Sequence, residues 1–290
     1  MEAGEDKYQM AVKKVAIQGV EGCFHDVAAR SYFKDEQVAA VAFDTFAQMT
    51  AAIAADPSLL GIMAIENTIA GSLLQNHELI LRHGLRIIGE YKMRISHALA
   101  ALPGQKIADI IEVNSHPMAL MQCEEYLLRH PHMKMIEKFD TAGSAREIAS
   151  LGLTGHAAVC SELAAEIYGL EVLESGIETN KRNFTRFLAV CHPSAPEAAG
   201  EEGADKASLV FTLPHNQGAL SKVLTVLSFY DLNLTKLQSF PIVGKEWEYK
   251  FYVDVAFDDY TRYLQALEAV RPLSGGLKIL GEYVSCKNIV

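Results

Sequence analysis

The stretch Asn183-Phe184-Thr185-Arg186-Phe187, followed by the apolar run Leu188-Ala189-Val190, predicts a buried strand that begins with a hydroxyl beside a guanidinium. Arg186 can hold a carboxylate in a two-pronged grip that lysine cannot reproduce, and Thr185 can donate a hydrogen bond beside it. The flanking phenylalanines would exclude water and strengthen both interactions. We interpret the stretch as the reactive edge of a cleft for a small carboxylic acid. A strand end with one surface arginine is the structural alternative, and these residues alone do not separate the two.

Composition limits the partners of the protein. Half of the 290 residues are hydrophobic, which is enough to bury a large core in two or three domains. The formal net charge of -10 argues against nucleic acid or an anionic membrane surface as partner, but not against a small anion. No apolar run is long enough to span a bilayer, and the N-terminus lacks a signal-peptide pattern. Five scattered cysteines without a CxxC pair are typical of reduced thiols, so we expect a cytoplasmic protein.

The first two thirds of the chain predict strands that alternate with helices. Strands are expected at residues 15–17, 60–65, 110–113 and 157–160, and helices at residues 24–33, 72–83, 117–129, 141–149 and 161–169. Such alternation predicts an α/β fold with mainly parallel sheets. Residues 1–13 are expected to form a short disordered lead.

Polar residues cluster where the expected strands meet their helices, as in Glu66-Asn67-Thr68, Asn114-Ser115-His116 and Asp140-Thr141. Parallel sheets place such corners along one edge, where ligands commonly bind, and free N–H groups at helix starts favour anions. Ordinary helix caps explain any single corner better than a binding site does. The set of corners together with Arg186 favours a receptor for a di-acid.

The composition changes abruptly at residues 192–206, which predicts a linker. Beyond it, strands are expected at residues 208–213, 233–240, 249–256 and 277–284, and helices at residues 216–227 and 260–270. The resulting order βαββαβ predicts a ferredoxin-like module. The free edge of its sheet favours pairing with a second copy of the chain, so we expect a homodimer or homotetramer.

Taken together, these motifs resemble prephenate dehydratase with its ACT regulatory domain, over the chain from about Lys13 to Val284. The catalytic part carries Gly19-x-x-Gly22-x-Phe24, Ile65-Glu66-Asn67-Thr68, Ser115-His116-Pro117, Asp140-Thr141-Ala142 and Asn183-x-Thr185-Arg186-Phe187. The C-terminal part carries Gly218-Ala219-Leu220 and Asn233-Leu234-Thr235-Lys236. Each motif is weak by itself, but their order and spacing are highly specific.

The resemblance implies a fold and a reaction. Residues 13–191 would form two lobes like those of a periplasmic binding protein, with a cleft between them, and residues 207–290 would form the ACT domain. The chain would cross between the lobes twice, with Arg186 on the return crossing. The reaction removes water and carbon dioxide from prephenate to give phenylpyruvate, without metal or coenzyme. Because an aromatic ring forms, the enzyme only has to hold the carboxylates and assist the departing hydroxyl.

The resemblance also implies roles for individual residues. Thr185 would assist the leaving hydroxyl, more by orientation and transition-state hydrogen bonding than as a free acid. Arg186 would bind a carboxylate, and Phe187 would pack the ring or order the strand. Glu66 would need a raised pKa to donate a proton, and a structural acid that caps the turn is the alternative. The remaining candidates for substrate binding are Asn67, Thr68, Ser115, Gln122, Cys23 and Thr141.

The C-terminal part would bind L-phenylalanine as an effector, through Asn216, Gly218, Ala219, Leu220, Asn233, Leu234 and Ser239. The alternative for Gly218-Ala219-Leu220 is that it only lets a helix pack closely on its sheet. The chain departs from the family pattern at this pocket, because Gln238-Ser239-Phe240-Pro241 stands where Glu-Ser-Arg-Pro is typical. It departs again at Cys23, which replaces a serine or threonine and is expected to be buried packing rather than a nucleophile.

Other chemistries have little support in the sequence. His130-Pro131-His132 lacks the spacing and partners of a metal site, and the Gly19 turn lacks both a GxGxxG pattern and a P-loop lysine. We therefore expect a prephenate dehydratase without metal or cofactor. Arogenate dehydratase, which acts on the amino-acid analogue of the same ring, is the alternative among enzymes. A non-catalytic aromatic amino-acid sensor is the alternative from another class.

Overall fold

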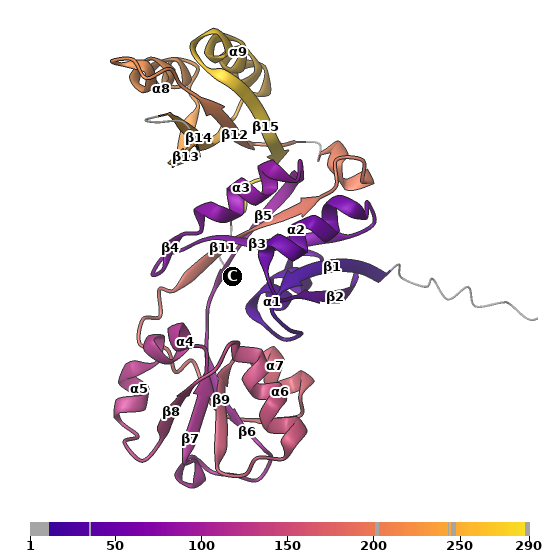
Figure 1. Ribbon diagram of the computed structural model, residues 1–290, viewed down its shortest axis with the longest axis vertical. Coiled ribbons are helices and arrows are strands. Elements are labelled where there is room, and N and C mark those ends of the chain that lie inside the picture. The colour runs from indigo at the N-terminus through magenta and orange to yellow at the C-terminus, as the bar shows by residue number, and fades with distance from the viewer. Residues whose placement is uncertain (1–11, 35, 201–202, 243, 245–247, 288–290) are drawn as a thin grey trace, which may run out of the picture. The chain divides into compact units, whose positions relative to one another are not determined.

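The structure is a computed structural model that describes residues 12–34, 36–200, 203–242, 244 and 248–287 (Figure 1). The chain divides into two compact units. The first comprises Met1–Met49, Leu59–Ile62 and Ile95–Asn183, and the second comprises Thr50–Ser58, Met63–Arg94 and Phe184–Val290. Within the described ranges, no helix has the length and apolar character needed to cross a membrane.

The first unit contains two groups of strands. Its elements are β1 (Val12–Gln18), α1 (Phe24–Tyr32), β2 (Gln37–Phe43), β6 (Ala98–Ala101), β7 (Glu112–Ser115), α4 (Pro117–Gln122), α5 (Glu124–Leu128), β8 (Lys134–Glu137), α6 (Thr141–Leu151), β9 (His156–Cys160), α7 (Glu162–Ile167) and β10 (Glu171–Ser175). Strand β1 pairs in parallel with β2, and a five-stranded sheet has the order β10-β6-β9-β7-β8. In this sheet β7 runs parallel to β8 and β9, whereas β6 is antiparallel to β9 and β10. The expectation of mainly parallel sheets therefore holds only in part.

Several expected elements of the first unit differ in their bounds; the strand expected at residues 110–113, for example, is β7 at Glu112–Ser115. Residues 12 and 13 already belong to β1, and residues 1–11 of the expected disordered lead lie outside the described residues. The helix expected over residues 117–129 is broken at Cys123, whose backbone angles are not helical, so that α4 and α5 are separate. The helix expected near residue 141 does form, because the side chain of Asp140 caps its first turn.

The second unit combines a mixed sheet with the C-terminal module. Its elements are β4 (Gly71–Ser72), α3 (Leu74–Arg82), β5 (Arg86–Arg94), β11 (Phe184–Cys191), β12 (Lys206–Thr212), α8 (Ala219–Phe229), β13 (Asn233–Pro241), β14 (Tyr249–Ala256), α9 (Tyr260–Val270) and β15 (Gly275–Tyr283), while β3 (Leu60–Asn67) and α2 (Phe46–Ala55) span the boundary of the units. Strands β3, β11 and β5 are neighbours in that order, and β5 runs antiparallel to β11. Helix α3 begins at Leu74, not at residue 72, because Gly71 and Ser72 pair with the end of β3.

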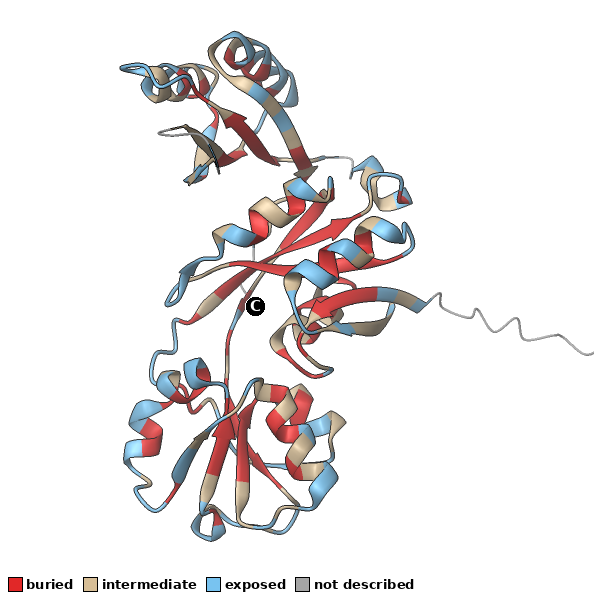
Figure 2. Cartoon of the chain, in the orientation of Figure 1, coloured by how far each residue is buried: buried red, intermediate tan, exposed pale blue. Residues whose placement is uncertain are grey.

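The C-terminal elements confirm the predicted order βαββαβ. Their sheet has the order β13-β14-β12-β15, and α8 and α9 pack on one of its faces. The C-terminal sheet has one apolar face and one polar face. Strand β12 shows this, because successive side chains of a strand point to opposite faces. Leu209 and Phe211 belong to the apolar core under the helices, whereas Lys206 and Ser208 point away from it. Figure 2 shows that β11 and β12 are buried along most of their length.

The polar face of the C-terminal sheet lies against the rest of the second unit. Gly281 on β15 comes so close to β5 that a Cβ atom there would lie 2.1 Å from the carbonyl oxygen of Ile87. Only glycine permits this approach of the two strands. Within the linker expected at residues 192–206, a short 3-10 helix forms at Pro196–Ala199, and β12 begins at the last residue. The domain boundaries stay predictions.

Candidate functional site

Strand alternation divides the predicted catalytic residues into two pairs on β3 and β11. Asn67 and Thr185 form the first pair, in which Asn67 Nδ2 donates to Thr185 Oγ1 over 2.9 Å. Glu66 and Arg186 form the second pair, with Arg186 Nη1 3.6 Å from Glu66 Oε1. Since successive strand residues point to opposite faces, the two pairs lie on opposite faces of the sheet. The sequence suggested that the hydroxyl and the guanidinium act side by side; in the structure they have different side-chain partners, although both residues line the cavity described below.

The Asn67–Thr185 pair is held in one orientation. Asn67 Oδ1 accepts hydrogen bonds from the backbone N–H groups of Ile69 and Ala70, both over 2.8 Å, so its amide cannot turn over without losing them. Thr68 joins the same turn to β11, because its Oγ1 accepts from the Phe184 N–H over 2.9 Å. Thr185 is buried and its oxygen accepts from Asn67. The hydroxyl therefore keeps its own hydrogen to donate to a ligand.

Arg186 lies in a buried network of charges. It is 5% exposed, and its Nε donates to Glu90 over 2.6 Å, its Nη1 to Asp254 over 2.6 Å and its Nη2 to the Tyr283 hydroxyl over 3.1 Å. Burial alone would lower the pKa of Arg186, but these carboxylates outweigh it and raise that pKa, so the guanidinium stays charged. The two-pronged grip that the sequence predicts for a substrate carboxylate is thus taken by Glu90 and Asp254. Arg186 joins β11 to β5 and to the C-terminal sheet.

Glu66 is held by a lysine of the C-terminal sheet. Lys236 Nζ contacts Glu66 Oε2 directly and lies 3.3 Å from Ser72 Oγ. Burial would raise the pKa of Glu66, but the hydrogen bond and charge of Lys236, together with the charge of Arg186, give a net lowering of that pKa. A proton donor needs the opposite direction. The structure therefore argues against Glu66 as the acid and favours the structural alternative, with Lys236 as the partner of the carboxylate.

A cavity of about 370 Å³ lies at the ends of these strands. It is lined by Glu66, Asn67, Thr68, Gly71, Ser72, Lys92, Phe184, Thr185 and Arg186. Phe187, the remaining catalytic candidate, is buried within β11 and does not line the cavity. Lys92 was missed by the sequence reasoning because β5 was not predicted. Charged residues at every second position, Glu90, Lys92 and Arg94, were the signal that could have found this strand.

Gln122 belongs to the first unit, where two side chains fix its amide. Its Oε1 lies 2.9 Å from His97 Nε2 and accepts from Asn183 Nδ2 over 3.0 Å. The pKa of His97 is lowered by burial, which favours the neutral ring. Because Oε1 can only accept, the ring carries its proton on Nε2. The acceptor end of Gln122 is therefore occupied, and its NH₂ group is the end available to a ligand.

The other three candidates of the first unit have local roles in the structure. Ser115 is fully buried, and its Oγ donates to the Val159 carbonyl of the neighbouring strand over 2.6 Å. Burial raises the pKa of the Cys23 thiol to about 12, which agrees with packing and not with a nucleophile. Thr141 is the first residue of α6, next to its cap Asp140. None of these contacts requires a ligand.

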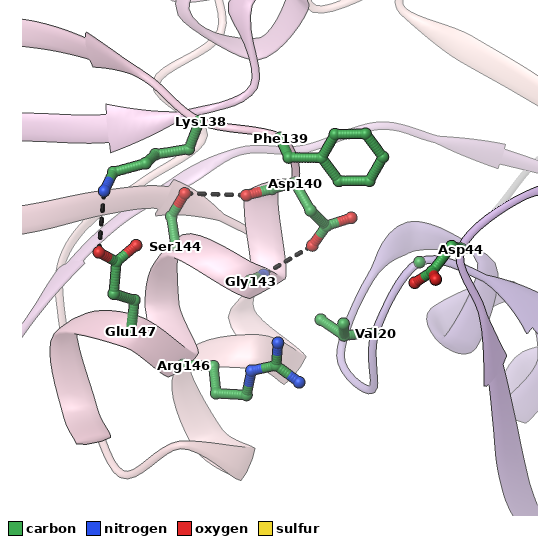
Figure 3. A pocket seen from close by; sticks show the side chains of 10 residues that line it. Val20, Asp44, Lys138, Phe139, Asp140, Gly143, Ser144, Arg146 and Glu147 are labelled. Carbon is green, nitrogen blue, oxygen red and sulfur yellow. Dashed lines mark hydrogen bonds and ion pairs between the residues drawn. The ribbon is translucent and has the colours of Figure 1, made fainter. Parts of the chain in front are cut away.

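A second cavity, of about 300 Å³, lies in the first unit at the start of α6 (Figure 3). It is lined by Gly19, Val20, Asp44, Lys138, Phe139, Asp140, Gly143, Ser144, Arg146 and Glu147. Most of its polar groups bind one another. Asp140 Oδ1 accepts from the Gly143 N–H over 2.6 Å, and Lys138 pairs with Glu147 over 2.8 Å. In Figure 3 the Arg146 side chain points into the open space toward Val20.

The predicted effector residues lie at the start of α8 and along β13. Gly218 is the N-cap of α8 and has φ of 80°, in the left-handed region that favours glycine. A Cβ atom there would meet nothing within 4 Å, so this glycine serves the backbone turn and not the close helix packing that was the alternative. Ala219 and Leu220 open α8 and pack against the C-terminal core. Asn216 precedes the helix, while Asn233, Leu234 and Ser239 lie on β13.

The histidines of the His130-Pro131-His132 stretch bind the backbone. His130 Nδ1 lies 2.9 Å from the Tyr126 carbonyl oxygen, and His132 Nε2 lies 3.4 Å from that of Ile107. Among the residues that the structure describes, no group of three or more His, Cys, Asp or Glu side chains is arranged to hold a metal ion.

The comparisons with a family model and with related sequences agree on one family. A family model described as prephenate dehydratase matches residues 15–195. The Arabidopsis thaliana protein "Arogenate dehydratase/prephenate dehydratase 2, chloroplastic" is 37% identical over 281 residues, which cover 93% of this chain and 72% of the relative. The chain is thus similar to enzymes named for two related substrates.

Two solved structures resemble more than nine tenths of the chain. One, described as "GqqA- a novel type of quorum quenching acylases", has a TM-score of 0.85 and 31% identity and covers 94% of this chain and 98% of its own. The other is prephenate dehydratase from Arthrobacter aurescens in complex with L-Phe. It has a TM-score of 0.79 and 28% identity and covers 93% of this chain and 89% of its own.

Proposed function

The chain belongs to the prephenate dehydratase family, and we propose that it converts prephenate to phenylpyruvate with loss of water and carbon dioxide. The family is one of hydro-lyases of aromatic amino acid biosynthesis. The observation that carries the proposal is the oriented Asn67–Thr185 pair beside a cavity of about 370 Å³. Such a pair presents one hydroxyl hydrogen to a ligand in a defined direction.

The proposed chemistry assigns one task to Thr185. As the ring hydroxyl departs, negative charge develops on its oxygen, and the hydrogen of Thr185 Oγ1 donates to that oxygen. Asn67 donates to Thr185 Oγ1, which supports the hydroxyl in this orientation. A preorganised donor of this kind lowers the barrier because it needs no rearrangement during the reaction. The electron pair of the broken carbon–oxygen bond leaves with the oxygen, which takes a proton from solvent and departs as water. Loss of the ring carboxylate as carbon dioxide completes the aromatic ring, because the electrons of the broken carbon–carbon bond enter the ring.

A substrate carboxylate needs a cation, and the structure offers Lys92 in place of Arg186. Lys92 is the cross-strand partner of Arg186 and lines the same cavity as Thr185 at the strand ends, and its side chain is one third exposed. Its Nζ lies 3.9 Å from Glu90 Oε1 and 3.5 Å from the Cys286 carbonyl oxygen, which are loose contacts compared with those of Arg186. We assign Lys92 to the binding of a carboxylate of the substrate.

Arogenate is the alternative substrate, because the Arabidopsis relative is named for both activities. Prephenate and arogenate share the reacting ring and differ in the side chain, so the Asn67–Thr185 pair serves either. The deciding experiment supplies each compound to the purified protein and measures phenylpyruvate from prephenate and phenylalanine from arogenate. A higher kcat/KM for prephenate supports the proposal. A higher kcat/KM for arogenate would mean that the same type of reaction acts on arogenate as the preferred substrate.

L-phenylalanine is the proposed effector. The proposal is supported by the Arthrobacter relative, which was solved in complex with L-Phe, and by the glycine turn at Gly218. Phe240, which stands where the family has arginine, weakens it. Equilibrium titration with L-phenylalanine and the same turnover assay in its presence test the proposal. No binding at millimolar concentration would reject it.

The location and assembly of the protein are proposals as well. We propose a cytoplasmic homodimer or homotetramer, and sedimentation of the purified protein gives the number of copies. Two other outcomes of the assays would change the function. Binding of L-phenylalanine without turnover of either substrate would favour a sensor. Turnover in an acylase assay would favour the activity for which GqqA is described.

A further inference from the structure

A buried lysine of the C-terminal sheet reaches the turn that carries Asn67. Lys236 lies on β13 and is 8% exposed, although its neighbours Thr235 and Leu237 on the strand are exposed. Its Nζ contacts Glu66 and Ser72, which face each other as a cross-strand pair of β3 and β4. One cation of the C-terminal sheet therefore bridges both strands, one residue before Asn67.

We propose that Lys236 is a positioning residue for the Asn67–Thr185 pair. By holding Glu66 and Ser72 together, it fixes the end of β3 from which Asn67 donates to Thr185. The C-terminal sheet thereby sets the geometry of the catalytic pair, although it contributes no residue to the pair itself. This inference rests on the proposed function, since it assigns a role in that reaction.

The charges around Glu66 define how its ionisation responds to the loss of Lys236. It faces Lys236 from β13, Arg186 from β11, Asp254 from β14 and His77 from α3. Burial, and then the charge of Lys236, lower the pKa of His77 to about 4, so this ring is neutral above that pH. Of the two cations, Lys236 is the one that hydrogen-bonds Glu66. Without it, the remaining burial and Asp254 would move the pKa of Glu66 upward.

The chain offers a matched control on the neighbouring strand. Lys250 of β14 pairs with both carboxylate oxygens of Glu78 on α3 over 2.9 Å, and the Tyr252 hydroxyl donates to the same carboxylate over 2.7 Å. This pair also joins the C-terminal sheet to the rest of the second unit. Glu78 does not line the cavity, so loss of Lys250 removes a similar contact without touching the Asn67 turn.

The test compares Lys236→Met, Lys236→Arg and Lys250→Met in the chain of 290 residues, with kcat and KM measured from pH 4 to 9 on the better of the two substrates. We expect Lys236→Met to lower kcat about tenfold or more with a small change in KM, because a displaced catalytic group costs rate more than binding. The acid limb of kcat should move to higher pH, since among the described residues Glu66 keeps only Arg186 as a nearby cation and is then protonated at higher pH. Lys236→Arg should restore most of the rate, and Lys250→Met should leave rate and pH profile unchanged.

Each outcome decides the inference. Equal losses in Lys236→Met and Lys250→Met without a shift of the acid limb would show that the lysines only stabilise the fold, and would overturn the positioning role. An undiminished rate in Lys236→Met would overturn it too. If only the positioning role of Lys236 is wrong, the wild-type protein still turns over its substrate. If the wild-type protein turns over neither prephenate nor arogenate, the proposed function fails, and with it the pair that Lys236 is proposed to position.

Discussion

Asn67 Nδ2 donates to Thr185 Oγ1 over 2.9 Å, across the boundary between two neighbouring strands. The two residues are separated by 118 positions in the chain, and their orientation depends on the turn after β3. This contact makes Thr185 a donor with a fixed direction. The contact lies on one face of the sheet, and the charged neighbours of the two residues, Glu66 and Arg186, point to the other face.

Removal of the Thr185 hydroxyl should affect the rate and not the fold. We expect Thr185→Val to lower kcat about 10²- to 10³-fold with little change in KM, since it removes a donor that acts mainly in the transition state. Thr185→Ser keeps the hydroxyl and should retain most of the activity. Steady-state kinetics with circular dichroism as a folding control measure this. Near wild-type turnover of the valine variant would remove Thr185 from the catalytic residues.

Replacement of Arg186 should affect stability first. Arg186→Met leaves Glu90 and Asp254 without their main counter-charge in a buried site, which typically costs about 3–5 kcal/mol of unfolding free energy. Arg271→Met is the control, because its pair with Glu268 is exposed and is expected to contribute less than about 1 kcal/mol. Urea denaturation measures both. A stable Arg186→Lys variant with only a raised KM would instead support the carboxylate-binding role predicted from the sequence.

The stability of the second unit should fall in acid. Burial alone would raise the pKa of Glu90 and of Asp254, but the charges of Arg186 and Lys206 outweigh it and lower both pKa values. A lowered pKa in the folded state means that the stabilisation is complete above the ordinary carboxyl pKa of about 4 and is lost as the pH falls through the folded value. Urea midpoints should therefore change little from pH 7 to 5 and drop below about pH 4. A flat midpoint through the acid range would contradict the buried network.

The free end of Gln122 can be tested with an isosteric change. Gln122→Glu keeps an oxygen for His97 and Asn183 but replaces the outward NH₂ group by a negative oxygen. If this group binds an anionic substrate, KM should rise about tenfold or more, because a donor is lost and a like charge is added. Gln105→Glu is the control, since Gln105 Oε1 likewise accepts a hydrogen bond, from the Gly155 N–H, but Gln105 lines neither cavity. Equal KM values would exclude Gln122 from binding.

Much of the fold followed from residue patterns. The βαββαβ order was predictable because the apolar residues of β12 and α8 recur with the periods of a strand and a helix. Strand β5 was not predicted because Glu90 and Lys92 interrupt its apolar pattern, and the close partners of Glu90, Arg186 and Lys206, lie far along the chain. A sequence period indicates which face a residue occupies, but not what lies against that face.

In the candidate site too, the sequence indicated the residues but not their distant partners. The turn from Glu66 to Thr68 and the stretch around Thr185 were both recognised, and the structure brings them together. The partners of Arg186 were not predictable, since Glu90 and Asp254 lie 96 and 68 positions away. The lowered pKa of Glu66 depends in the same way on Lys236, 170 positions away. Long-range charge pairs, not local patterns, decided these roles.

Gly281 has a consequence for how this chain can change over generations. Its backbone lies against that of Ile87, so the contact tolerates no side chain at position 281 of β15. A C-terminal sheet taken from a relative would fit only if it brought a glycine to the same place and matching charges for β3, β5 and β11. The two halves of the second unit are therefore inherited together, and a substitution accepted by one half restricts which substitutions the other can accept later.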